Sequence, residues 1–174
     1  MKAGVLVSCI LLLTVVLSLF STIVQATEYK VVNTEVNAED ILKHIENGDD
    51  VNLTNCRIVG ELNLSKIQLK TVTITDLRII MNNIAIEDSK FENKIDFSNV
   101  QFNNTVSFKK PFFKNSADFQ EADFFNSANF HDTNFNKDAN FSGAIINDTS
   151  NFIGLGNPDK IKLTTNIPPL LNTK

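Results

Sequence analysis

The chain has 174 residues, a length that suits one domain, and its 16 basic and 20 acidic residues give a formal net charge of −4. This mild acidity disfavours nonspecific binding to nucleic acid phosphates. Two Cys, two His and no Trp stand beside 14 Phe. The composition therefore excludes a disulfide-rich scaffold and leaves few side chains for metal or acid-base chemistry.

The first 26 residues differ from the rest of the chain. Lys2 precedes an almost unbroken apolar stretch from residue 3 to residue 24, and Val24-Gln25-Ala26 offers the small residues that a signal peptidase needs. We expect a secretory signal peptide, residues 1–26, cut after Ala26, so that the protein is secreted or extracytoplasmic. The stretch is also long enough to span a bilayer, which leaves an uncleaved membrane anchor as the alternative.

Residues 27–50 are expected to form a capping segment that contains a short helix. Ile41, Leu42 and Ile45 recur at helical spacing, Asn37 can cap the amino end, and Gly48 can end the helix. Such a helix would cover the open apolar end of whatever fold follows and protect its first strand edge.

From residue 51 to residue 152 an apolar anchor recurs every eleven residues, in two interleaved series. In the second half the anchors are Phe91, Phe97, Phe102, Phe108, Phe113, Phe119, Phe124, Phe130, Phe135, Phe141 and Phe152. Followed backwards, the series pass through Ile86, Ile80, Thr75, Leu69, Leu64, Ile58 and Leu53, and only Thr75 among them is not apolar. One of the two series closes on Ile146. A strict repeat of this length predicts an all-β solenoid, because each unit is too short to bury its own apolar side chain and must stack on its neighbours.

Small residues two positions before the anchors complete the repeat, as in Ala117-Asp118-Phe119-Gln120-Glu121 and Ala139-Asn140-Phe141-Ser142-Gly143. These runs resemble the pentapeptide-repeat family. The resemblance implies a right-handed quadrilateral β-helix with one unit on each side. Alternate units here carry a sixth residue, so we expect coils of 22 residues that run without insertion from Leu53 to Phe152, with Phe97, Phe119 and Phe141 in one column.

Residues 153–174 form a tail. Leu155, Ile161 and Leu163 either fold back over the last coil or leave that end of the solenoid open for a homodimer. Both alternatives stay open at the level of sequence.

Catalytic features are scarce. His44 and His131 lie in segments with no reason to meet, and Asp96, Asp118 and Asp123 precede their anchors, where they would point outward and hydrogen-bond the corners. The sequence shows no glycine-rich phosphate loop and no strand-to-helix serine elbow. We therefore expect no enzyme, no cofactor and no metal site.

Two rings outside the repeat, Phe112 and Phe125, are expected to face solvent and to form a contact surface. Five Asn-X-Ser/Thr sequons are compatible with glycosylation of an exported protein. Their Asn residues are Asn52, Asn63, Asn103, Asn140 and Asn147.

Two functions are compatible with these sequence features. The first is an exported, non-catalytic scaffold or interaction module that holds an unknown protein or cell-envelope component, without nucleic acid and with membrane contact only if the amino-terminal segment is uncleaved. The alternative, implied by the family resemblance, is a DNA-mimicking inhibitor of a topoisomerase such as gyrase. A short rod, a mild net charge and the predicted signal peptide favour the scaffold.

Overall fold

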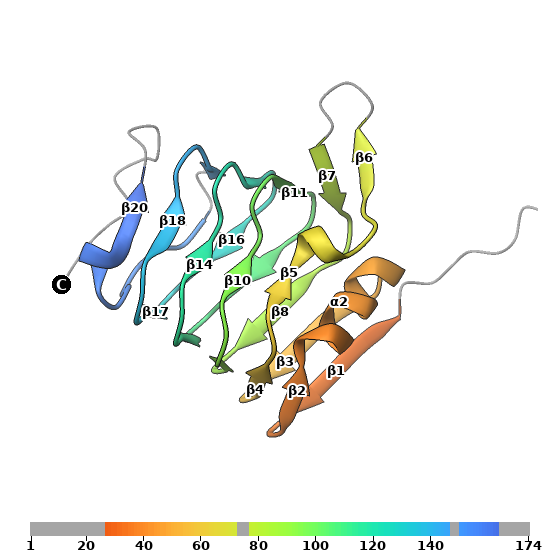
Figure 1. Ribbon diagram of the computed structural model, residues 1–174, viewed down its shortest axis with the longest axis horizontal. Coiled ribbons are helices and arrows are strands. Elements are labelled where there is room, and N and C mark those ends of the chain that lie inside the picture. Colours follow the sequence, from red (N-terminus) through yellow and green to blue (C-terminus); the bar gives the residue numbers. More distant parts are fainter. Residues whose placement is uncertain (1–26, 73–76, 147–149, 164–174) are drawn as a thin grey trace, which may run out of the picture.

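The computed structural model describes residues 27–72, 77–146 and 150–163 of the chain (Figure 1). The predicted signal peptide, Thr75, Asn147 and the tail from residue 164 lie outside the described residues. Most of the regular secondary structure is β-strand, arranged in four five-stranded sheets. We name the sheets A to D in the order in which the chain visits them.

The strands of each sheet come from successive coils. Sheet A contains β1 (Glu28–Val32), β3 (Asp50–Thr54), β8 (Ile84–Glu87), β12 (Val106–Ser107) and β16 (Ala128–Asn129). Sheet B contains β2 (Glu35–Asn37), β4 (Arg57–Val59), β9 (Lys90–Phe91), β13 (Phe112–Phe113) and β17 (Asn134–Phe135). Sheet C contains β5 (Leu62–Asn63), β10 (Ile95–Asp96), β14 (Ala117–Asp118), β18 (Ala139–Phe141) and β20 (Ile161–Leu163). Sheet D contains β6 (Lys70–Val72), β7 (Leu77–Ile80), β11 (Val100–Phe102), β15 (Asp123–Phe124) and β19 (Ile145–Ile146).

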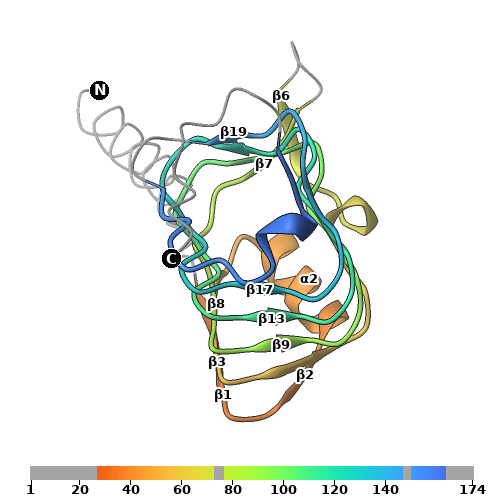
Figure 2. The ribbon, with the colours of Figure 1, turned by 90° about the vertical axis from the view of Figure 1, so that its left-hand side faces the viewer.

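Parallel pairing confirms the predicted β-solenoid. Every strand pair is parallel except β6 with β7, which is antiparallel. Viewed from the carboxyl-terminal end, the four sheets surround a common core (Figure 2). The parallel sheets also extend beyond the predicted range 51–152, because β1 and β2 join at one end and β20 at the other.

One coil is longer than the others. Partners lie 22 residues apart between β1 and β3, as for Tyr29 and Val51, and again from β8 onward, as for Ile84 and Val106. Between β3 and β8 the offset is 33 residues, because Val51 pairs with Ile84. The prediction of an uninterrupted 22-residue coil is therefore wrong here, and Leu53 pairs with Ile86 instead of joining a column through Thr75.

The extra residues of this long coil form an appendage between sheets C and D. They include the 3₁₀ helix η1 (Leu64–Lys66) and strand β6. Leu69, expected as an inward anchor, is only half-buried. Since the insertion equals one period of the repeat, it leaves the inward and outward positions of every later residue unchanged, which is why the sequence alone did not reveal it.

The core is a stack of phenylalanine rings. Ten of them have less than 2% exposure: Phe91, Phe97, Phe102, Phe108, Phe113, Phe119, Phe124, Phe130, Phe135 and Phe141. Ring centroids of Phe119 lie 5.8 Å from Phe97 and 4.6 Å from Phe141, so the predicted column is confirmed. Small inward residues, such as the fully buried Ala128 and Ala139, leave room for these rings.

Equivalent corners of successive coils have the same backbone conformation. Asn99, Glu121 and Gly143 all have positive φ and occupy equivalent corners one coil apart. Asp96 accepts a hydrogen bond from the Ser98 backbone N–H (3.1 Å), and Asp118 accepts one from Gln120 (2.9 Å). The predicted role of these two carboxylates at the corners is confirmed.

Helix α2 (Ala38–Asn47) closes the amino-terminal end, where it replaces two sides of the first coil (Figure 2). Asn37 caps it by accepting from the Glu39 N–H, Gly48 ends it in the left-handed conformation, and Ile41, Leu42 and Ile45 are buried, as predicted. Among the described residues, no helix is long and apolar enough to cross a membrane.

The carboxyl-terminal end is covered by the chain that follows Phe152. Leu155, before the 3₁₀ helix η2 (Pro158–Lys160), and Ile161 and Leu163, after it, are partly buried and pack against the core. These three residues therefore fold back on the last coil, while the homodimer stays a prediction.

Candidate functional site on sheet D

The outward face of sheet D carries an unusual concentration of apolar side chains. Five large hydrophobic residues of the described chain are exposed: Val32, Met81, Phe125, Ile145 and Ile153. Three of them, Met81 (55%), Phe125 (66%) and Ile145 (64%), lie on or directly beyond strands of sheet D. Clustered exposed apolar residues of this kind mark contact surfaces more often than scattered ones do.

The strand register shows how these residues are arranged. Ile79, Gln101, Asp123 and Ile145 are successive partners and form one outward column. A second column contains Met81, Asn103 and Phe125, each directly after a strand, and the Asn103 amide donates to the Met81 sulfur (3.2 Å). We call these seven residues the sheet D face.

Asp123 is the one ionisable member of the sheet D face. It lies between Gln101 and Ile145, and burial by its neighbours raises the pKa of its carboxyl group. The face therefore offers apolar groups, amides and a single poorly solvated carboxyl group, which suits a largely uncharged partner surface.

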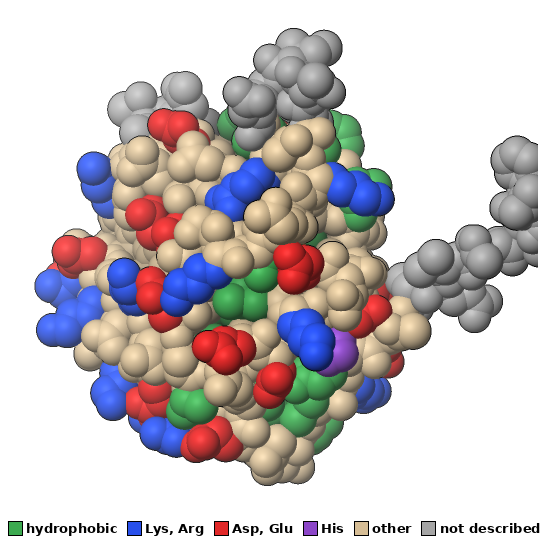
Figure 3. Space-filling model, turned by 45° about the vertical axis from the view of Figure 1, so that its right-hand side comes forward, with side chains coloured by type: hydrophobic (Ala, Val, Ile, Leu, Met, Phe, Trp, Pro, Cys, Tyr) green, Lys and Arg blue, Asp and Glu red, His purple; other side chains and the backbone are tan. Residues whose placement is uncertain are grey.

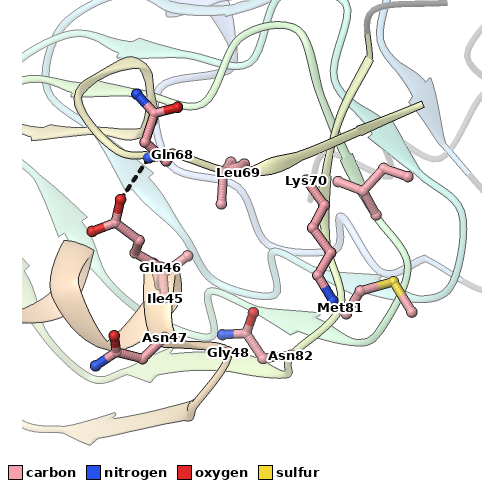
Figure 4. Close-up of a pocket in the computed structure, with 10 residues that line it drawn as sticks. Ile45, Glu46, Asn47, Gly48, Gln68, Leu69, Lys70, Met81 and Asn82 are labelled. Atoms are coloured by element: carbon pink, nitrogen blue, oxygen red, sulfur yellow. Dashed lines mark hydrogen bonds between the residues drawn. The ribbon is translucent and has the colours of Figure 1, made fainter. Parts of the chain in front are cut away.

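A small cleft lies at one end of this face (Figure 4). Its volume is about 120 Å³, and it separates the carboxyl-terminal end of α2 from the appendage of the long coil. Ile45, Glu46, Asn47, Gly48, Gln68, Leu69, Lys70, Ile79, Met81 and Asn82 line it. Glu46 accepts a hydrogen bond from the Gln68 N–H (2.7 Å), which ties α2 to the appendage. A space of this size holds one side chain or a few waters, so it extends the sheet D face but is no substrate pocket.

The two aromatic residues predicted as a contact surface do not meet. Phe125 follows β15 on sheet D and is exposed, whereas Phe112 is half-buried in β13 of sheet B, with Lys90 and Asn134 as its register partners. Met81 and Ile145 were missed by the sequence reading. They occupy outward positions next to the anchors Ile80 and Ile146, so the alternation that identified Phe125 could also have found them.

The sequon asparagines that the structure describes are partly buried, and their side chains already have partners. Asn52 donates to Glu28 (2.8 Å), Asn63 accepts from Ser65 (2.8 Å), Asn103 contacts Met81, and Asn140 donates to Asp118 (3.2 Å). In the folded chain, a glycan on the side-chain nitrogen of Asn52, Asn103 or Asn140 would have to replace one of these hydrogen bonds.

The two His residues lie in separate parts of the fold. His44 contacts Asp49 near the amino-terminal end, while His131 lies in the fifth coil beside Asp132. Within residues 27–72, 77–146 and 150–163, no three His, Cys, Asp or Glu side chains are grouped as a metal site would need. Cys56 is buried, in the inward position that its spacing before Ile58 predicts.

Sheet B carries a network of charges instead of apolar groups. Glu92 accepts from Lys114 (2.7 Å), Lys90 (2.9 Å) and Arg57 (3.0 Å), and Arg57 also pairs with Glu35. Hydrogen bonds from Lys114 and Lys90 are the largest influences that lower the pKa of Glu92 to about 2.

This network predicts a defined acid sensitivity. Because the folded-state pKa of Glu92 lies below its ordinary value of 4.5, its contribution to stability is complete above about pH 4.5 and is lost as the pH falls towards 2. Glu92→Gln should therefore melt at a lower temperature than the unchanged protein at pH 7, and the difference should disappear near pH 2. Thermal melting across this range checks the prediction. Glu121→Gln, outside the network, should not reproduce the pattern, and a constant difference at all pH values would contradict it.

Comparison with known proteins agrees with this geometry. Stacked parallel coils around a phenylalanine core define a β-solenoid repeat protein. Residues 97–145 and 113–154 match the family model described as pentapeptide repeats (9 copies). Residues 97–154 therefore consist of pentapeptide repeats, and proteins with such repeats are generally structural or interaction proteins. No curated protein and no solved structure matches the chain in the other two comparisons.

Proposed function

We propose that this protein is an exported, non-catalytic scaffold that uses the sheet D face to hold another protein or a cell-envelope component. The observation that carries the proposal is the concentration of Met81, Phe125 and Ile145 on one sheet. The family match supports a repeat protein without enzymatic activity, and the predicted signal peptide supports export. We further propose that the coils have the right-handed quadrilateral form which the family resemblance implies.

The charge distribution favours this function over DNA mimicry. A mimic of duplex DNA needs a dense acidic surface, whereas sheet B places Arg57, Lys90 and Lys114 around Glu92. Acidic and basic side chains also alternate over the face of the molecule turned towards the amino-terminal end (Figure 3). We therefore expect the purified protein to leave gyrase supercoiling activity unchanged.

Replacing Phe125 with Ser tests the sheet D face. The ring is 66% exposed, so the melting temperature should change by less than about 3 °C, while partner capture or self-association should weaken. Photo-crosslinking in the producing cell from position 125 or 145 measures whether the sheet D face contacts a partner. Position 134 on sheet B is the comparison. Gel filtration reports self-association.

Two outcomes would count against the proposed function. Equal crosslinking from positions 125 and 134 would show that the sheet D face is not preferred. A full-length product in the cytoplasmic fraction would contradict export and would return attention to the topoisomerase alternative. As a matched control, Phe124→Ser removes a buried ring from the neighbouring position and should lower the melting temperature strongly.

A further inference from the structure

Thr27, the first residue after the predicted cleavage point, is held in place by the amino-terminal end of the solenoid. Its hydroxyl group donates a hydrogen bond to Asp49 Oδ1, and its carbonyl oxygen accepts one from the Asp50 N–H (2.8 Å). Asp49 Oδ2 lies 2.8 Å from His44 Nδ1. We call Thr27, His44 and Asp49 the Thr27 site.

The carboxylate of this site is fixed from several directions. Asp49 follows the end of α2, where its backbone N–H donates to the His44 carbonyl oxygen (3.0 Å). The Asn82 amide, from the next coil, donates to the Asp49 carbonyl oxygen. The His44 ring stacks on Tyr29 of β1 with 3.9 Å between centroids. Asp49 is thus positioned before any cation arrives, and its side chain is only 14% exposed.

The surroundings favour a positive charge at the Thr27 nitrogen. Hydrogen bonds to Asp49 from the Thr27 side chain, from His44 and from the Thr27 backbone lower the pKa of the carboxyl group, so it is ionised at neutral pH. The ionisable side chains on the packed elements are Glu39, Asp40, Lys43, His44 and Glu46 of α2, Glu28, Tyr29 and Lys30 of β1, and Asp50 of β3. Carboxylates predominate among them.

We propose that Asp49, oriented by His44, is the binding site for the α-ammonium group that signal cleavage creates on Thr27. Hydrolysis of the Ala26–Thr27 peptide bond adds the hydroxyl of water to the Ala26 carbonyl carbon and a proton to the Thr27 nitrogen, which takes up a second proton at neutral pH. This nitrogen belongs to the residue whose hydroxyl group already bonds to Asp49, so the new cation forms close to the same carboxylate. Removal of the signal peptide therefore strengthens the attachment of β1, the outermost strand of sheet A.

The inference rests on the export proposed above, but its test does not depend on export. Two forms of the protein are produced by cleavage of a fusion partner that leaves no extra residue. One begins at Thr27, and the other begins at Ala26 and so moves the charge by one residue. The described core lies wholly within both. Melting temperatures are then measured from pH 5 to pH 10, with and without Asp49→Asn.

The form that begins at Thr27 should melt about 2 to 5 °C higher at pH 6 to 7. The carboxylate of Asp49 raises the pKa of a neighbouring ammonium group above its ordinary value of about 8. The difference in melting temperature between the two forms is therefore complete below about pH 8. It is lost as the pH rises through the folded-state pKa of the ammonium group. The advantage should also disappear in the Asp49→Asn pair, a comparison that cancels any general effect of that substitution. Equal melting of the two forms at pH 6 to 7 would overturn the proposal.

Two further measurements test the Thr27 site independently of the melting experiment. If Asp49→Asn does not fold, an NMR titration of the Thr27 amine in the unchanged protein replaces it, and a pKa at or below about 8 overturns the proposal. The mass of the exported protein separates the two proposals. A mature chain that begins at any residue other than Thr27 overturns the Thr27 site and leaves the sheet D face untouched, while an uncleaved cytoplasmic chain overturns both.

Discussion

Phe119→Ala is expected to lower the free energy of unfolding by about 3 to 5 kcal/mol. The ring of Phe119 has no exposed surface and lies at the centre of the aromatic stack. Its centroid is 4.6 Å from that of Phe141, 5.3 Å from Phe130 and 5.8 Å from Phe97, so truncation removes contacts in its own column and in the neighbouring one. Urea denaturation monitored by circular dichroism measures the loss.

The control for this experiment is the next residue. Gln120 is exposed, and Gln120→Ala should change the free energy of unfolding by no more than about 0.5 kcal/mol. If Phe119→Ala leaves too little folded protein, Phe119→Leu preserves most of the volume and should cost less than about 1.5 kcal/mol. Equal losses for the Phe119→Ala and Gln120→Ala proteins would refute the assignment of the ring to the core.

Arg78→Met is expected to produce the second large effect, a loss on the order of 2 to 4 kcal/mol, because hydrogen bonds to a charged group contribute about 1.5 to 3 kcal/mol each. Arg78 is half-buried and donates to the Leu64 carbonyl oxygen (2.8 Å) and to the Ser98 carbonyl oxygen (3.0 Å). It thereby joins the long coil to the coil that follows. Methionine keeps an unbranched apolar side chain but removes both donors.

Later coils explain why an arginine is needed at this position. Val100 is the register partner of Arg78, and Ala122 follows one coil further on. There the Ala122 backbone N–H donates directly to the Phe119 carbonyl oxygen (3.1 Å). The insertion separates Arg78 in sequence from Leu64, so a long side chain makes the equivalent connection. Arg78→Lys should give an intermediate loss in urea denaturation, and a loss below about 0.5 kcal/mol for Arg78→Met would contradict this role.

The sequence predicted the repetitive part of the fold because one physical requirement recurs there. Each anchor Phe of the repeat, from Phe91 onward, needs an inward position and a partner one coil away, which determines both the strand alternation and the columns. The helix was equally predictable, since Asn37 and Gly48 provide its capping chemistry at both ends. The long coil could not be predicted. Its extra residues equal one period of the repeat, so the alternation of inward and outward residues continues across them unchanged.

The candidate site was predicted only in part, for a related reason. Alternation places Phe125 outward, but which outward residues become neighbours depends on the number of residues in each coil. Phe112 and Phe125 were expected to form one surface because both rings fall outside the repeat, but they lie on sheets B and D. The neighbours of Phe125 on the sheet D face include Ile145, its diagonal neighbour one coil further on, which only the strand register reveals.

The long coil suggests how such a chain can acquire new surface during evolution. The extra eleven-residue segment loops out between sheets C and D, so the residues before and after it keep their sides of the rod and the buried rings stay inside. Here the added segment carries Leu69 and Lys70 out to a cleft beside α2. The surface of such a solenoid can therefore change by whole repeats while the phenylalanine core stays the same.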